Sequence, residues 1–206
     1  MSAVLDLTEK TEKTQLNGSV AYVKKPYLIS VKTYDSMIKH GILTENDNVE
    51  LLNGAIIEKM SKGTKHTSAT NLVTRFFYRH IDEKAVIRVQ DPILLDDFSE
   101  PEPDIVLAKP PIEKYLSQHP TPEDILLIIE VSDSTLHFDR NNKGEAYSRA
   151  GIAQYLIVNV ENDTIEDYRK PDEDGFQSKE TYRRGESFSL VAFPDLEIKT
   201  EDFLPG

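Results

Sequence analysis

A glutamate at the end of a run of aliphatic residues is the feature that most constrains this chain. Residues 125 to 130, ILLIIE, place Glu130 directly after five aliphatic side chains. Such a short run, bounded by polar residues, predicts a strand buried on both faces of a sheet, with the carboxylate near its end. A buried carboxylate without a partner costs several kcal/mol or stays protonated. We therefore expect a cation, a metal ion or a hydrogen-bond network close to Glu130.

Length and composition limit the classes of protein to consider. A chain of 206 residues fits one compact domain, which we expect at residues 26 to 206 after a polar, aperiodic tail or strap at residues 1 to 25. The absence of cysteine excludes disulfides, thiolate zinc sites and a cysteine nucleophile. The N-terminal sequence resembles neither a signal peptide nor a membrane span, so we expect a cytoplasmic protein without membrane contact.

The charge of the chain is unevenly distributed. A formal net charge of -12 argues against loose binding of DNA or of anionic membranes, because the overall field repels polyanions. Residues 58 to 88 nevertheless contain seven basic side chains against three acidic ones. The basic ones are Lys59, Lys62, Lys65, Arg75, Arg79, Lys84 and Arg88. One face of the molecule could therefore still be basic.

The first half of the chain predicts helices around a hairpin. Ser30 as N-cap and Gly41 as the residue after the last turn predict a short helix between them. Residues 48 to 60 predict two strands joined through Asn53-Gly54, with Glu50 on the first strand. From residue 67 to residue 81, apolar residues recur at three- and four-residue steps, which predicts a helix that starts beside His66.

The second half predicts a mixed sheet. We expect strands at 85–90, 92–97, 104–108 and 125–131, a helix capped by Asn141 or Asn142 and ended by Gly151, and antiparallel strands at 153–160, 164–170, 176–184 and 187–193. A rigid, proline-bearing turn should place Asp104 at the head of its strand. Helices interleaved with strands indicate an α/β (α+β mixed sheet) fold in which helices pack on a central sheet.

Asp104, Glu130 and Lys143 form the main candidate site. Two carboxylates on neighbouring strands can hold a divalent cation through oxygen ligands, which would compensate the buried charge of Glu130. A lysine beside them can orient water or stabilise charge on a phosphorus under attack. Alone, each acidic residue is more often a solvated strand end, and a lysine in a first helical turn is more often exposed. The ordered set favours a hydrolytic centre.

This pattern resembles the PD-(D/E)XK superfamily of nucleases. Pro103-Asp104 matches the first motif, but EVS places Ser132 where these proteins usually carry lysine. In one branch the lysine has moved to the following helix, where Lys143 stands. The segments VELLNGAIIEKMS, PEPDIVLA, LLIIEVSDST and KGEAYSRAGIAQYLIVNV, with His66 after the first, resemble in this order the Uma-two family of restriction-endonuclease-like proteins over roughly residues 26 to 170.

The resemblance implies a restriction-endonuclease-like core and a metal-dependent endonuclease. Asp104 and Glu130 would bind Mg²⁺ (or Mn²⁺) with the backbone carbonyl of Val131, Lys143 would position the attacking water, and Glu50 would be an additional acidic member of the site. The resemblance does not define the substrate. Our first hypothesis is DNA, with its backbone contacted by Lys59, Lys62, Lys65, Arg75 and Arg79 if the helix that starts near His66 borders the cleft. His66 would contact phosphate or substrate, or else only pack or cap its helix.

Other interpretations remain open at the level of sequence. A catalytically inactive nuclease fold that binds nucleic acid or protein is the main alternative, because the fold does not dictate activity. A serine or histidine hydrolase has little support, since no nucleophile elbow or ordered triad is visible. We assign Tyr147 and Tyr155 to the core. Exposed strand edges near the C-terminus, and the two active sites that duplex cleavage needs, lead us to expect a homodimer.

Overall fold

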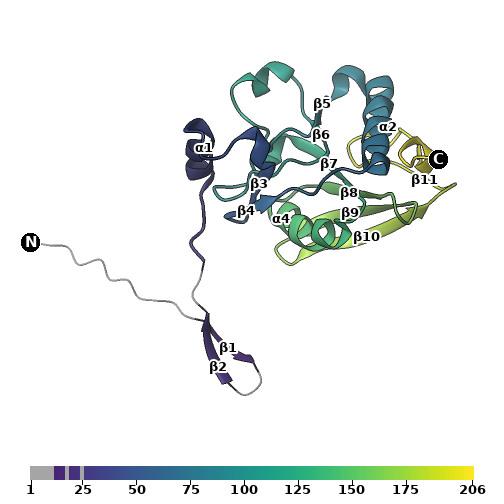
Figure 1. Cartoon of the computed structure of the whole chain (residues 1–206). Coiled ribbons are helices and arrows are strands. Elements are labelled where there is room, and N and C mark those ends of the chain that lie inside the picture. The colour runs from purple at the N-terminus through teal and green to yellow at the C-terminus, as the bar shows by residue number, and fades with distance from the viewer. Residues whose placement is uncertain (1–11, 17–18, 24–25) are drawn as a thin grey trace, which may run out of the picture.

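A six-stranded mixed sheet forms the centre of the molecule (Figure 1). The computed structural model describes residues 12–16, 19–23 and 26–206. In spatial order the sheet contains β10 (Gly175–Arg183), β9 (Thr164–Asp172), β8 (Gln154–Asn159), β7 (Ile125–Ser132), β6 (Ile105–Ala108) and β5 (Val86–Val89). Only β7 and β8 pair in parallel. This arrangement confirms the predicted mixed α+β class.

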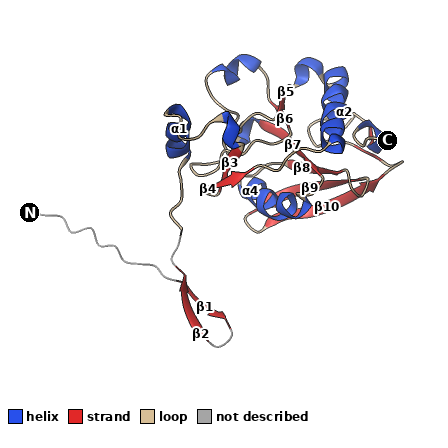
Figure 2. Cartoon of the chain, viewed as in Figure 1, coloured by secondary structure: helices blue, strands red, loops and turns tan. Residues whose placement is uncertain are grey.

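The described residues also form helices and short two-stranded ladders (Figure 2). The helices are α1 (Val31–Lys39), α2 (Thr64–His80), α3 (Leu136–Phe138), a π-helical segment Asp139–Lys143 and α4 (Gly144–Arg149), with short 3₁₀ turns at Glu45–Asp47, Asp82–Lys84, Ile112–Leu116, Pro122–Asp124 and Thr200–Asp202. The ladders pair β1 (Glu12–Leu16) with β2 (Ser19–Val23), β3 (Val49–Leu52) with β4 (Ala55–Glu58), and β11 (Ser187–Phe188) with β12 (Ile198–Lys199). No described helix is long and apolar enough to cross a membrane.

The two faces of the sheet carry separate hydrophobic clusters. On one face, α2 buries Val73 and Phe77 against alternate residues of β7, among them Ile129, and the C-terminal Phe203 joins this cluster. On the other face, α4 buries Tyr147 against Ile128. Strand residues alternate between the faces, so Glu130 lies on the same side of the sheet as Ile128. That side is where the helix carrying Lys143 packs.

Several local signals predicted the observed elements. Ser30 caps α1 by accepting a hydrogen bond from the backbone N–H of Thr33, and Gly41 follows its end at φ 68°. Asn53 and Gly54 join β3 to β4 with φ values of 51° and 75°, as a tight primed turn requires. The strand that ends near Glu130 is buried along nearly its whole length. These predictions are confirmed.

Two predicted strands are wrong. Residues 92–97 are extended but form no strand, because their N–H groups bond to different loops: Ile93 to the carbonyl of Pro101, Leu94 to that of Pro120 and Leu95 to that of Ser99. In the predicted strand 187–193, only Ser187–Phe188 pairs with another strand. The rest of that segment forms turns and irregular structure.

The predicted cap of the helix after β7 is also wrong. The helical run begins at Leu136, so Asn141 and Asn142 lie inside it rather than before it. Residues Asp139–Lys143 are π-helical, and the Tyr155 hydroxyl donates to the carbonyl of Asp139 at 3.1 Å. A tertiary contact thus supports a local conformation that no propensity indicates. Gly151 follows the helix end at φ 77°, as predicted.

The N-terminal segment was predicted as polar and aperiodic. Residues 1–11, 17–18 and 24–25 lie outside the described residues. Within the described part, β1 and β2 pair antiparallel from Glu12 with Val23 to Leu16 with Ser19. The sequence did not predict these two strands, and the tail or strap at residues 1 to 25 stays a prediction.

Candidate active site

Glu130 receives hydrogen bonds from three sides. The Lys143 ammonium donates to its Oε1 at 2.9 Å, the Tyr147 hydroxyl donates to the same oxygen at 2.8 Å, and the backbone N–H of Asp104 lies 3.3 Å from Oε2. Burial raises the pKa of Glu130 to about 8, although the charge of Lys143 acts in the opposite direction. The sequence predicted a partner for the buried carboxylate of Glu130. Two side chains of the helical run after β7, Lys143 and Tyr147, take this role.

Lys143 is buried between acidic side chains. Its Nζ lies 2.9 Å from Glu130 Oε1 and 3.3 Å from Glu50 Oε1. Burial alone would lower the pKa of Lys143, but the charges of Glu130, Glu50 and Asp139 outweigh it and raise the pKa above its usual value. Lys143 therefore stays protonated and can donate hydrogen bonds. The expectation of an exposed lysine in a first helical turn does not hold, because Lys143 is only 7% exposed and closes the π-helical segment.

Asp104 lies at the head of β6 and is also held by protein donors. Its Oδ2 accepts from the backbone N–H of Val131 at 2.9 Å and lies 3.0 Å from His66 Nε2, while Oδ1 accepts from the Gln90 side chain at 3.0 Å. Burial by itself would raise the pKa of Asp104, but these hydrogen bonds and the charge of His66 lower it. Asp104 is therefore the ionised carboxylate of the pair.

Glu50 connects the β3–β4 hairpin to Lys143. Its Oε2 accepts from the backbone N–H of Glu102 at 3.0 Å, and the Glu102 carboxylate binds Lys59 at 2.5 Å. Glu50 is 2% exposed, so it is not a hairpin glutamate that simply faces water. The hairpin turn at Asn53-Gly54 fixes the register of β3 and β4 and thereby aims Glu50 at Lys143.

The site opens into a cavity of about 470 Å³. Glu50, Asp104, Glu130, Lys143 and His66 all line it, together with Val131, Lys59 and Lys62. The structure therefore brings together the acidic and lysine residues that the sequence selected. His66 points its Nε2 at Asp104, which favours a place in the site over simple packing or capping of α2.

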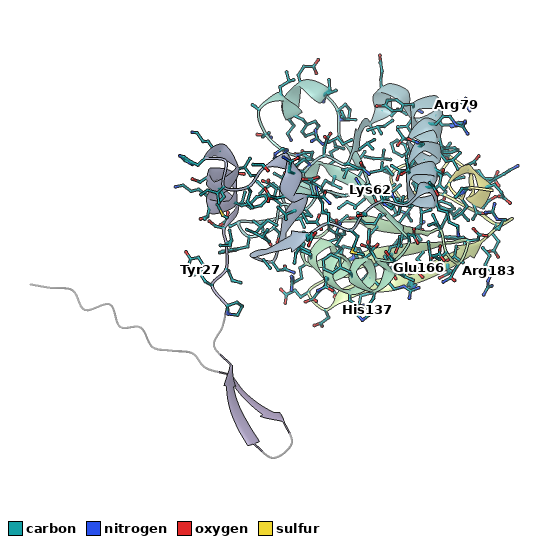
Figure 3. The ribbon with its side chains drawn as sticks, in the orientation of Figure 1. Tyr27, Lys62, Arg79, His137, Glu166 and Arg183 are labelled. Atoms are coloured by element: carbon teal, nitrogen blue, oxygen red, sulfur yellow. The ribbon has the colours of Figure 1, made fainter. Side chains whose placement is uncertain are left out.

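The predicted nucleic-acid contacts divide into two groups. Lys59 and Lys62 line the cavity, whereas Lys65 is exposed and pairs with Glu161 at 3.1 Å. Arg75 and Arg79 are exposed farther along α2, and Figure 3 shows Arg79 at the end of α2 distant from Lys62. Only the first part of the predicted basic surface thus borders the cavity.

Sequence reasoning missed Asp139, Tyr147 and Gln90 as members of this site. Asp139, Lys143 and Tyr147 are spaced four apart, and all three are buried on the side of the helix that faces Glu130. That spacing was a usable signal, since residues four apart share a helix face. Gln90 gave no such signal: it follows β5 in a left-handed conformation, φ 56°, and donates to Asp104. Such a conformation in a residue with a side chain is often found at functional sites.

The donor chemistry of the site fits a small divalent cation. Four carboxylates are buried here: Glu50, Glu130 and Asp139 lie near the ammonium of Lys143, and Asp104 lies beside Glu130. Among the described residues no three histidine or acidic side chains are spaced to hold a metal together. Mg²⁺, however, is commonly bound through one or two carboxylates and retains several waters. Asp104 and Glu130 suit that mode of binding.

Comparison with known proteins identifies the family. The family model described as "Uma2: Putative restriction endonuclease" matches residues 31–201. The chain belongs to the Uma2 family. This confirms the resemblance inferred from the sequence and extends it toward the C-terminus. No curated protein matches the chain.

A solved structure supports the Uma2 assignment at the level of the fold. It is described as a "putative nuclease belonging to DUF820 from Anabaena variabilis", and it is similar with a TM-score of 0.65 and 14% sequence identity. The similarity covers 85% of this chain and 97% of that one. This likeness confirms the predicted fold, a restriction-endonuclease-like core. The description of the Uma2 family as restriction endonucleases supports a nuclease in general terms.

Proposed function

We propose that this Uma2 protein is a Mg²⁺-dependent endonuclease that hydrolyses phosphodiester bonds of DNA. Asp104 and Glu130, with the backbone carbonyl of Val131, would bind Mg²⁺ (or Mn²⁺), and Glu50 would complete the acidic shell. The observation that carries this proposal is the position of Lys143, whose ammonium lies 2.9 Å from Glu130 and 3.3 Å from Glu50. This contact supports Lys143 as the lysine of the motif, which carries Ser132 at the usual lysine position.

The residues would divide the chemistry between them. Mg²⁺, when bound, supplies polarisation of the scissile phosphate and neutralisation of its developing charge. Lys143 has three N–H donors. One donates to Glu130, and another can orient the attacking water. Burial among acidic side chains raises the pKa of Lys143, so in the metal-free protein it is a hydrogen-bond donor. His66 and Gln90 hold Asp104 in place from both of its oxygens.

The test compares cleavage by matched lysine and carboxylate variants. Plasmid and single-stranded DNA are incubated with Mg²⁺ or Mn²⁺ and the wild type, Asp104→Asn, Lys143→Gln, Lys65→Gln or Lys39→Gln. We expect the first two variants to lose at least about a hundredfold in rate. Lys65→Gln tests a predicted DNA contact, and Lys39→Gln is the control that should keep wild-type activity, because Lys39 is exposed on α1 and lies outside the cavity. Circular dichroism checks that each variant is folded. Metal-dependent cleavage by a folded Asp104→Asn variant would contradict the assignment.

A catalytically inactive binding module is the second candidate. It is favoured by the hydrogen bonds that already occupy both oxygens of Asp104 and of Glu130. Such a module should retain nucleic acid or protein ligands in Lys143→Gln and show no turnover with any metal. The cleavage assay above separates the two candidates.

The remaining expectations belong to the same proposal. Residues 26 to 206 would form one domain, preceded by a tail or strap at residues 1 to 25, and the protein would act in the cytoplasm as a homodimer. Strand β10 is an edge of the central sheet and supports the idea of self-pairing, because its backbone groups on the outer side can accept another strand. Light scattering during gel filtration measures the number of subunits.

A further inference from the structure

The cavity at the candidate active site has an apolar wall that hydrolysis does not require. Ile57 of β4 and Phe138 of α3 line the cavity and pack, half-buried, against the hydrophobic cluster that contains Tyr147. Met60 lines it as well and remains 60% exposed. Phosphate oxygens and water need polar partners. An apolar wall beside the carboxylates therefore indicates that another part of the ligand is apolar.

The two chain segments that border the cavity approach each other closely. Residues 58–63 and 133–138 both line it, and a Cβ at Gly63 would lie 3.0 Å from Asp133 Oδ2. Figure 3 labels one residue of each segment, Lys62 and His137. A cavity of about 470 Å³ falls in the range of small-ligand sites. Its size suits one nucleotide unit.

We propose that the wall of Ile57, Met60 and Phe138 receives an unpaired nucleobase beside the scissile phosphate. The substrate class would then be single-stranded or locally unpaired nucleic acid. This inference rests on the proposed nuclease function and specifies its substrate. In a paired duplex the bases are stacked inside, and the protein meets chiefly phosphates and groove edges, so this wall would have no partner. An unpaired base can contact aromatic and apolar side chains whatever its identity.

The charges around the cavity agree with entry of a single strand. Lys59 is held by Glu102, whereas Lys62 lines the cavity and makes no ion pair within the part of the chain that is described. Lys62 can therefore contact the phosphate that follows the bound nucleotide. The side chains of Ile57, Met60 and Phe138 would form the neutral part of the site.

The experiment compares three oligonucleotides of one sequence on the full chain with Mn²⁺ present. They are a single strand, the paired duplex and a single strand with an abasic position at the mapped cleavage site. The variants are Phe138→Ala and Phe138→Leu, the second keeping apolar volume in case the first does not fold. Tyr78→Ala is the control, because Tyr78 is an exposed aromatic residue of α2 outside the cavity.

We expect the single strand to be cut faster than the duplex, and the abasic substrate to raise KM by about fivefold or more. Phe138→Ala should raise KM for the intact strand by a similar factor and abolish the difference between intact and abasic strands. Tyr78→Ala should retain both preferences. Equal cleavage of duplex and single strand, or a folded Phe138→Ala that still distinguishes the abasic site, would overturn the inference.

Binding separates failure of this inference from failure of the nuclease proposal. Fluorescence anisotropy with the same oligonucleotides in Ca²⁺ requires no cleavage. If no DNA is cut but binding depends on the base and on Phe138, the base site stands and hydrolysis is rejected. If wild-type protein binds no oligonucleotide in Ca²⁺ and cuts none in Mn²⁺, both proposals fail.

Discussion

Glu130 and Asp104 occupy contrasting environments although they lie on neighbouring strands. Burial raises the pKa of Glu130 to about 8, while hydrogen bonds from His66, Val131 and Gln90 lower that of Asp104. Without a further cation, Glu130 therefore holds its proton more readily than an ordinary glutamate, whereas Asp104 is ionised. A bound divalent cation would favour the ionised form of both.

The Tyr147 hydroxyl is expected to position Glu130. Tyr147→Phe keeps the buried ring but removes the 2.8 Å hydrogen bond to Glu130 Oε1. Hydrogen bonds to charged groups contribute about 1.5–3 kcal/mol, so we expect kcat to fall about tenfold and the Mg²⁺ requirement to shift to higher concentration. Cleavage rates over a Mg²⁺ titration measure both effects.

Tyr182→Phe is the control for this prediction. The Tyr182 hydroxyl donates to Glu180 on β10, outside the cavity. Its loss should leave kcat and the Mg²⁺ dependence unchanged. If both variants show the same Mg²⁺ dependence as wild type, Tyr147 contributes only to packing.

At the scale of elements, the hairpin β3–β4 depends on one glycine. Gly54 has φ 75°, and a Cβ there would lie 2.7 Å from Leu28 Cβ. Gly54→Ala should therefore destabilise the protein by more than about 1 kcal/mol, because both the backbone conformation and the contact with Leu28 become strained. Urea unfolding measures the change.

Gly144→Ala provides the contrast within the same experiment. Gly144 is helical, and the nearest atom to a new Cβ there would be the Asp139 carbonyl oxygen at 3.4 Å. We expect this variant to be as stable as wild type or up to about 1 kcal/mol more stable. A Gly54→Ala variant that matches Gly144→Ala would show that the hairpin tolerates a side chain at its turn.

The helical run after β7 is joined to the sheet by Glu166. Arg140 donates to both carboxylate oxygens of this β9 residue, and Lys179 and Tyr168 bind it at 2.9 and 2.6 Å. Burial by itself would raise the pKa of Glu166, but these hydrogen bonds lower it from 4.5 to about 2. The ionised carboxylate therefore stabilises the folded state.

The low pKa of Glu166 predicts a specific loss of stability in acid. In the unfolded chain the group titrates near its ordinary value of 4.5, so its stabilisation is present above that pH and is lost as pH falls toward about 2. The full effect is about 3 kcal/mol. The stability difference between wild type and Glu166→Gln should shrink from pH 6 to pH 3 in urea unfolding. A Glu166 difference that stays constant over this pH range would contradict the prediction.

At the scale of the whole molecule, the excess of negative charge leads us to expect that the cavity binds divalent cations. The chain carries a net charge of -12, and seven carboxylates line the cavity against three lysines. We expect Mg²⁺ to raise the melting temperature, because ligand binding to the native state at a hundredfold excess over Kd stabilises it by about 2.7 kcal/mol. EDTA should remove this gain and abolish retention of single-stranded DNA.

The controls for this prediction separate binding from ionic strength. KCl at matched ionic strength should not reproduce the effect of Mg²⁺, and Asp104→Asn should not respond to Mg²⁺. The prediction fails if Asp104→Asn gains as much stability from Mg²⁺ as wild type does.

The sequence alone determined the features whose information lies within a few neighbouring residues. The ends of α1 at Ser30 and Gly41, the turn at Asn53-Gly54 and the buried strand that ends near Glu130 follow from capping, turn geometry and hydrophobicity. The ordered motifs also identified the family and selected Asp104, Glu130, Lys143 and Glu50, which the structure brings to one cavity.

Only the tertiary structure decided how these residues are held. Residues 92–97 form no strand because their N–H groups bond to separate loops. The π-helical segment that places Lys143 is supported by Tyr155 of β8. Tyr147, Gln90 and the apolar wall at Phe138 join the site through contacts between residues distant in the chain. Such contacts depend on packing of whole elements, and local propensity carries no information about them.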